Sequence, residues 1–215
     1  MHELVSARGP FVSVHLPPGT DASELLDPLD VGAATRTTLK RTLASGAGVD
    51  GRSVIVAGSH VLVDEPPAWS PPSLALRVSD LPYLLPLAPR HAVRALVGSV
   101  PGRAVFDQFV IESARPEGLV VDGLARCAAT VSAGDAEALV VRLDLIGDRA
   151  VWVGGTHRDE VAADPETTRA AGLPPNPQRA DEALPMAALA IGAEVLVTED
   201  LPLADGVGVL LRNPE

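Results

Sequence analysis

The residue types that could carry catalysis are few and scattered along the chain. None of the five histidines has a carboxylate or a second histidine at ligand spacing; they are His2, His15, His60, His91 and His157. We therefore expect structural or exposed imidazoles and no metal site. The single cysteine, Cys127, falls on the apolar face of a predicted helix, with no protonated histidine or helix N-terminus nearby. This setting predicts a buried, inert thiol.

Two glycine-containing segments invite a ligand-binding interpretation, and neither has the required context. Gly154-Gly155-Thr156-His157 follows an apolar strand but opens no helix, so we expect a turn that ends the strand. Asp205-Gly206-Val207-Gly208 contains the spacing G-x-G, yet it precedes a terminal strand. A dinucleotide fingerprint has the reverse order, strand first and helix second. The sequence therefore predicts no catalytic residue, no cofactor and no enzyme activity.

Two groups of charged residues remain as candidate sites. Arg36, Lys40 and Arg41 gather on one side of a helix predicted from about Asp30 to Leu43, with an apolar stripe that includes Val31, Ala34 and Thr38 opposite. This group is consistent with contact to RNA phosphates or with a solvated helix face.

The second group, Arg179, Asp181 and Glu182, stands before a helix that ends near Ile191. Asp181 is a candidate N-cap with Glu182 near the positive end of the helix dipole; alternatively, Pro185 starts the helix at its first position. Capping and docking of a partner protein both fit these residues.

The charge of the chain is divided unequally between its two halves. The formal net charge is −11, of which residues 1–90 carry −2 and residues 91–215 carry −9. A uniformly basic nucleic-acid coat is excluded, and DNA is not expected as a partner. The acidic half favours a protein partner. With one cysteine, no secretory leader and no long apolar segment, we expect a cytoplasmic protein that does not enter membranes.

The pattern of apolar residues predicts alternating strands and helices. Phe11–Leu16 is typical of a strand, and Ser53–Ala57 and Val61–Val63 flank a turn with Gly58, which indicates a hairpin. In the second half, residues 118–132 are predicted as one helix with Val120, Leu124, Cys127 and Val131 on its buried face. Further strands and helices alternate to the end of the chain, and Asp164, followed by Pro165 and Glu166, is predicted as the N-cap of one of these helices. The sequence therefore predicts an α/β fold.

Several segments resemble the bacterial branch of the archaeo-eukaryotic, Pelota-like peptide chain release factor family, and in particular its actinobacterial, hibernation-factor-like members. The resemblance covers about residues 8–87 and 105–212. The segments that carry it are Arg8–Val14, Gly51–Ala57, Arg77–Tyr83, Arg179–Leu184, Gly192–Val195 and Asp205–Arg212.

The resemblance implies a small α+β N-terminal domain over residues 1–88, a linker over 89–104, and an L7Ae-like α/β/α C-terminal domain over 105–215. It also implies a ribosome-associated factor whose first domain contacts ribosomal RNA, with Arg36, Lys40 and Arg41 as contact candidates. The second domain would dock on a translational GTPase or another protein through a region that includes Arg179, Asp181 and Glu182. Some relatives act in stress, in ribosome hibernation.

The chain departs from this family in two respects: only about residues 88–104 stand where a central domain would be, and the Gly-Gly-Gln loop of true release factors is missing. We therefore expect no peptidyl-tRNA hydrolysis. Three hypotheses follow: a non-catalytic translation-associated factor, an acidic protein-binding adaptor that has lost ribosome binding, and a small hydrolase. The hydrolase requires carboxylates, or a histidine and a nucleophile, that the fold brings together.

Overall fold

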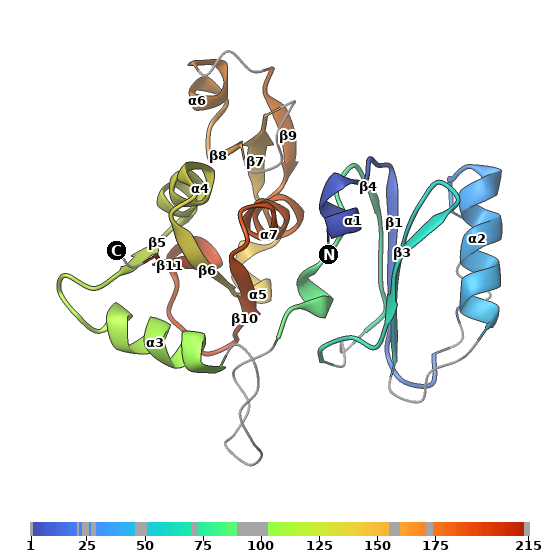
Figure 1. The fold of residues 1–215 in the computed structure, drawn as a ribbon, viewed down its shortest axis with the longest axis horizontal. Helices are drawn as coiled ribbons and strands as arrows, with labels where there is room; N and C mark the ends of the chain where they lie inside the picture. Colours follow the sequence, from blue (N-terminus) through green and yellow to red (C-terminus); the bar gives the residue numbers. More distant parts are fainter. Residues whose placement is uncertain are drawn as a thin grey trace. The chain divides into compact units, whose positions relative to one another are not determined.

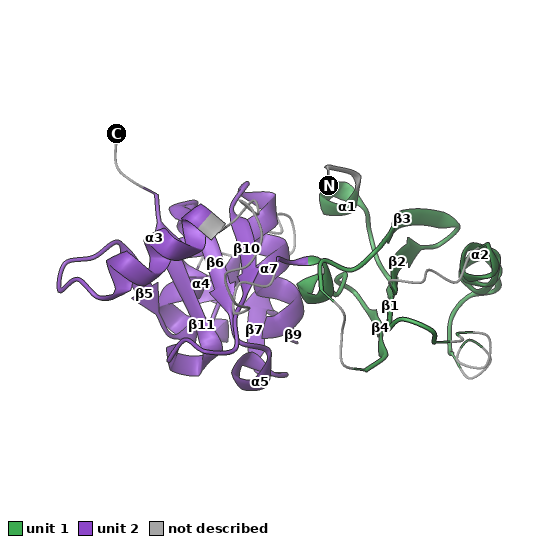
Figure 2. Ribbon diagram, turned by 90° about the horizontal axis from the view of Figure 1, so that it is seen from below, with its two compact units in different colours: residues 1–87 green, residues 88–215 purple. Residues whose placement is uncertain are grey.

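The computed structural model describes residues 2–20, 22, 26, 29–45, 51–69, 73–89, 103–154, 160–170 and 174–212. The chain forms two compact units, residues 1–87 and residues 88–215 (Figure 2). Both mix helices and sheets, so the predicted α/β class is confirmed. Most of the predicted linker, residues 90–102, lies outside the described part.

The first unit is an antiparallel sheet with one long helix (Figure 1). Its strands lie in the order β3-β2-β1-β4. Its elements are α1 (His2–Ser6), β1 (Phe11–Leu16), α2 (Ala33–Ala44), β2 (Arg52–Ala57), β3 (His60–Glu65), β4 (Ala75–Ser79) and the 3-10 turn η2 (Leu85–Leu87). The predicted hairpin is confirmed as β2 and β3, and Gly58 has the positive φ of 57° that its turn requires.

Successive side chains of β1 lie on opposite faces of the sheet, and a different segment of the chain covers each face. Val12, Val14 and Leu16 face α2 and pack with Leu39 in one apolar cluster. The side chains between them, including Ser13 and His15, lie on the opposite face, where residues 81–87 cover them.

Helix α2 forms as predicted, and its buried face agrees with the expected stripe in part. Thr38 is buried and Val31, just before the helix, packs against the core, whereas Ala34 is exposed. The buried residues of the helix are Thr35, Thr38, Leu39 and Thr42. These positions follow the i, i+3, i+4, i+7 spacing of a helix face. Three of these four residues are threonines, and of these the apolar pattern of the sequence indicates only Thr38.

The second unit is built around a mixed sheet with the order β10-β6-β11-β5. Its elements are α3 (Arg103–Ser113), β5 (Val120–Asp122), α4 (Leu124–Ala133), β6 (Ala136–Val141), α5 (Leu143–Ile146), β7 (Ala150–Val153), β8 (Val161–Ala162), α6 (Pro165–Ala170), β9 (Asn176–Arg179), α7 (Ala180–Ala190), β10 (Glu194–Val197), η3 (Ala204–Gly206) and β11 (Val207–Leu211).

Three layers make up this unit. Helix α3 packs Phe109 against Ala138, Val140 and Leu210 on one face of the sheet. Helices α4 and α7 pack on the other face, against β11, β6 and β10. The short sheet β8-β7-β9 and α6 form a small lobe beside α4 and α7 (Figure 1). This arrangement agrees with the predicted α/β/α order of layers.

The helix predicted over residues 118–132 is wrong in its first part. Residues 120–122 form β5, which pairs with β11 in antiparallel register. Gly123 then adopts a φ of 86°, and α4 begins only at Leu124. The apolar spacing alone could not reveal the pairing with a strand almost 90 residues later.

Candidate functional site

Helix α2 presents the three basic candidates in different environments. Lys40 and Arg41 are exposed. Arg36 is half-buried, and its Nη2 donates a hydrogen bond to the Leu29 carbonyl at 2.6 Å. Arg36 thereby ties the chain that enters α2 to the helix itself. From Gly32 to Ser45 the sequence holds these three cations and no acid.

A fourth cation near the end of α2 is engaged in an ion pair. The Arg52 guanidinium donates to both carboxylate oxygens of Asp64, at 2.7 and 2.9 Å. Its Nη2 also lies 3.3 Å from the Ser45 hydroxyl, just after the helix. The hydrogen bond that Arg52 donates to Asp64 raises the pKa of Arg52. On α2 itself, the exposed cations are Lys40 and Arg41.

On the opposite face of the same sheet, the fold brings His15 and Ser53 together. His15 Nε2 donates to the Tyr83 carbonyl at 2.8 Å, which leaves Nδ1 to accept from the Ser53 hydroxyl at 2.8 Å. Both side chains are fully buried, and desolvation lowers the pKa of His15 to about 4. The pair has the chemistry of a base and a nucleophile. Without access for a substrate, its effect is to fasten residues 81–87 to the sheet, and the structural role predicted for His15 is confirmed.

In the second unit, Arg179, Asp181 and Glu182 form one cluster at the start of α7. Arg179 donates to both carboxylate oxygens of Asp181, at 3.0 and 2.9 Å, and its Nε lies 3.8 Å from Glu182 Oε1. Asp181 is 4% and Glu182 1% exposed. The hydrogen bond to Asp181 raises the pKa of Arg179. Asp148, in the turn before β7, lies 3.8 Å from Arg179 Nη1.

Neither predicted start of α7 is correct. Arg179 occupies the N-cap position without a side-chain cap, and Pro185 lies inside the helix. Asp181 and Glu182 are in its first turn, where the helix dipole favours acids. Both acids are buried, so the cluster joins β9 and α7. Arg179, with 33% of its side chain exposed, is the most exposed of the three residues.

The remaining arginines of the second unit are also engaged, wherever the structure describes their side chains. Those that form ion pairs are Arg115, Arg126, Arg142, Arg149 and Arg169. Arg212 donates to the carbonyls of Ala136 and Ile191. The cations whose side chains the structure describes in this unit are thus used within it, and the unit as a whole has an excess of acids.

Cys127 is fully buried on α4, as predicted. Its Sγ lies 3.7 Å from the carbonyls of Val121 and Val207. Desolvation raises the pKa of this thiol to about 12, so it is unsuited to act as a nucleophile at neutral pH.

The segment from Asp205 to Gly208 is structural. A Cβ on Gly206 would lie 2.5 Å from the backbone nitrogen of Ile146, and one on Gly208 would lie 2.7 Å from the Phe109 ring. Both glycines are required by close packing. Strand β7 ends at Val153 before the other glycine pair, as predicted, but residues 155–159 lie outside the described part.

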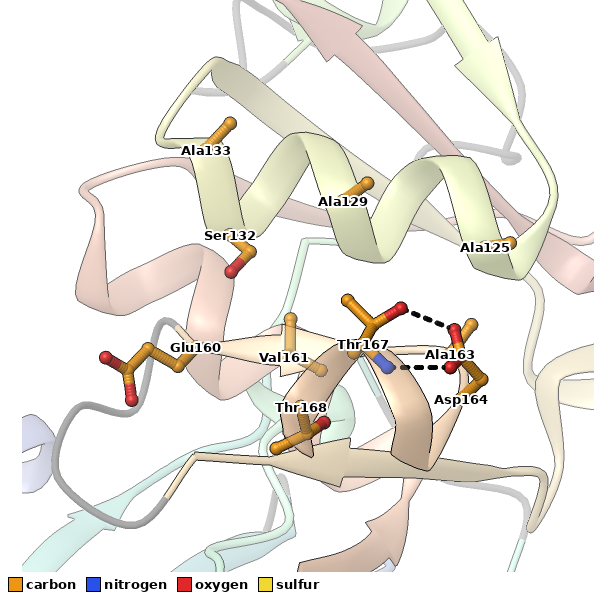
Figure 3. Close-up of a pocket in the computed structure, with 11 residues that line it drawn as sticks. Ala125, Ala129, Ser132, Ala133, Glu160, Val161, Ala163, Asp164, Thr167 and Thr168 are labelled. Carbon is orange, nitrogen blue, oxygen red and sulfur yellow. Dashed lines mark hydrogen bonds between the residues drawn. The ribbon is translucent and has the colours of Figure 1, made fainter. Parts of the chain in front are cut away.

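A groove of about 440 Å³ lies between α4 and the β8–α6 segment (Figure 3). On the α4 side it is lined by small residues, including Ala125, Ala129 and Ser132. Opposite them, Asp164 caps α6: its two carboxylate oxygens accept from the backbone N–H and the hydroxyl of Thr167, at 2.9 and 2.8 Å. These bonds hold the pKa of Asp164 below its usual value. The carboxylate is committed to the helix, as the sequence predicted.

Within the described ranges, no three His, Cys, Asp or Glu side chains are grouped so that they could hold a metal ion. In the same ranges, no helix is long and apolar enough to cross a membrane. The architecture is therefore that of a two-unit α/β protein with a basic helix in one unit and internally paired charges in the other.

No family model matches the sequence. Two curated relatives are the uncharacterized proteins MT2704 and Rv2629, from two strains of Mycobacterium tuberculosis. Each is 43% identical over 111 residues, which cover 50% of this chain and 29% of the relative. The match thus spans less than a third of the length of these relatives.

Two solved structures are weakly similar to this chain. One is an archaeal protein with a TM-score of 0.28 and 12% identity, over 100% of this chain and 96% of the other. The second is the archaeal translation termination factor aRF1, with a TM-score of 0.27 and 12% identity, over 97% and 94%. Similarity at this level carries no argument about fold or function.

Proposed function

We propose that this protein is a non-catalytic, translation-associated factor that binds the ribosome through its first unit. The observation that carries this proposal is the surface of α2, where Lys40 and Arg41 are exposed on a helix without acids. In a chain of net charge −11, such a surface is suited to RNA phosphates. The resemblance of the sequence segments to Pelota-like factors supports the ribosome as the source of that RNA.

The second unit would contact a protein partner, with a translational GTPase as the first candidate. Two observations support this part of the proposal. Residues 91–215 carry −9 of the net charge, and the described arginines of this unit are used in internal contacts. An acidic surface of this kind repels RNA and favours a basic protein surface.

The proposal of a non-catalytic role rests on the buried state of the reactive groups. His15 and Ser53 are fully buried, Cys127 has a raised pKa, and Asp164 is occupied as a helix cap. The small-hydrolase hypothesis would need another pair of groups that faces a cavity.

Sedimentation of cell extracts on sucrose gradients tests the proposal, in growing and in starved cells, because hibernation is one condition in which such factors act. We expect the wild-type protein in the ribosomal fractions. A Lys40→Ala/Arg41→Ala variant should dissociate from the ribosomes at a lower salt concentration than the wild type does. Arg8→Ala, which removes an exposed cation outside α2, is the matched control. Absence from ribosomes and subunits in every growth state would refute ribosome binding and favour the adaptor hypothesis.

A further inference from the structure

The outer face of α2 combines small, hydroxyl-bearing and cationic side chains. Its exposed positions are Ala33, Ala34, Thr37, Lys40, Arg41 and Ala44. Thr37, Lys40 and Arg41 have the spacing i, i+3, i+4, so their side chains share one face of the helix, with neighbouring Cβ atoms about 5–6 Å apart. A hydroxyl thus stands beside two cations.

The alanines on this face allow close approach. Ala33 and Ala34 precede the polar group and Ala44 follows it, so short side chains flank it at both ends of a helix about 18 Å long. Because the helix carries no acid, no carboxylate on it opposes a polyanion that lies along this face.

Aromatic side chains are missing from this face. Residues 1–90 contain three aromatic residues, Phe11, Trp69 and Tyr83. Phe11 is fully buried and Tyr83 is 8% exposed. Trp69 is half-buried, and the N–H of the neighbouring Ala68 bonds to the Pro86 carbonyl. This segment is distant from α2 in the sequence and forms that hydrogen bond with another part of the unit. Recognition of single-stranded RNA depends on bases stacked on aromatic rings, and α2 offers no such ring.

We infer that the ligand of α2 is the backbone of double-stranded RNA, with Thr37 as a further contact residue. This inference rests on the proposed function. The shallow minor groove of an A-form helix exposes 2′-hydroxyls between two rows of phosphates. In this arrangement Lys40 and Arg41 contact phosphates, and the Thr37 hydroxyl bonds to a 2′-hydroxyl. Arg36 acts as a positioning residue, because its bond to Leu29 holds the start of the helix.

Fluorescence anisotropy of the full chain with a short RNA duplex, the matching DNA duplex and the single RNA strand tests this inference. We expect the RNA duplex to bind at least roughly fivefold more tightly than the single strand. Lys40→Ala and Arg41→Ala should each reduce the salt slope by about one. Thr37→Ala should weaken RNA-duplex binding about threefold, leave DNA-duplex binding unchanged, and be rescued by Thr37→Ser, because only RNA has the 2′-hydroxyl.

The outcomes separate the two proposals. If the single strand binds as tightly as the duplex, or Thr37→Ala weakens RNA and DNA equally, the duplex inference is overturned while ribosome association stands. If wild-type protein binds no RNA and does not sediment with ribosomes, both fail. Because Thr37, Lys40 and Arg41 are exposed, these variants should fold, and circular dichroism checks this.

Discussion

Asp205 caps a helix that begins 81 residues earlier in the sequence. Its Oδ2 accepts a hydrogen bond from the backbone N–H of Leu124, the first residue of α4, at 3.1 Å. Its Oδ1 lies 3.3 Å from Arg149 Nη1. Gly123, at the N-cap position, has no side chain that could supply an acceptor. A tertiary contact therefore satisfies an N–H that the helix leaves unpaired, and places a negative charge at the positive end of its dipole.

Replacement of Asp205 by alanine should lower the free energy of unfolding by about 1–2 kcal/mol, the usual cost of a lost cap. Asp205 has a φ of 55°, a conformation that asparagine tolerates better than alanine. Asp205→Asn keeps an oxygen acceptor and should cost less than half as much. Urea denaturation measures both, with Glu117→Ala as the exposed-acid control. If Asp205→Ala costs no more than this control, Asp205 does not stabilise α4.

Disruption of the Arg179 cluster should be more costly. Arg179→Met removes the bidentate donor to Asp181, a carboxylate that is 4% exposed, so we expect a loss of about 3 kcal/mol in the free energy of unfolding. Asp181→Asn added to this variant should recover part of the loss, because it removes the buried charge. Arg169→Met is the control, since its ion pair with Glu166 is exposed and should contribute little. Equal losses for the two arginines would contradict a structural role.

Local patterns in the sequence predicted those elements whose signals lie within a few residues. The hairpin around Gly58, the cap of α6 by Asp164 and the buried Cys127 are of this kind. The start of α4 and the strand β5 were missed because they depend on Asp205 and β11, far along the chain. Propensity and periodicity contain no information on such contacts.

The candidate sites show the same division. The sequence placed Arg36, Lys40 and Arg41 on one helix, yet only the structure shows Arg36 bound to Leu29. Likewise, the pairing of His15 with Ser53 follows from the antiparallel register of β1 and β2, in which the two residues lie opposite each other. Each residue looked unremarkable in sequence because its partner is remote.

His15 should make the stability of the first unit depend on pH. Its pKa is about 4 in the folded state and 6.5 in the unfolded state. The unfolded state therefore binds more protons between these values, and the free energy of unfolding falls as the pH is lowered from 6.5 to 4. The loss from this group amounts to about 3 kcal/mol at the acid end and is absent above pH 7.

Denaturant titrations from pH 4 to 7.5 measure this dependence. His15→Leu should be less stable at pH 7, because it deprives Ser53 and the Tyr83 carbonyl of a partner. It should also lose most of the slope between pH 6.5 and 4. The exposed His60, replaced by glutamine, is the control for removal of a histidine. A full slope in the His15→Leu variant would show that other groups cause the pH dependence.

Cys127 should report on the unfolding of the second unit. Its pKa of about 12, compared with 9.0 for the free side chain, reduces the thiolate fraction at pH 8 about a thousandfold, and burial blocks access. We expect iodoacetamide to label it in urea and to leave it unmodified in native buffer. A Ser132→Cys variant places an exposed thiol on the same helix, and it should react at once while Cys127 in the same molecule does not. Peptide mass spectrometry distinguishes the two sites, and rapid native labelling of Cys127 would show that α4 opens readily from the sheet.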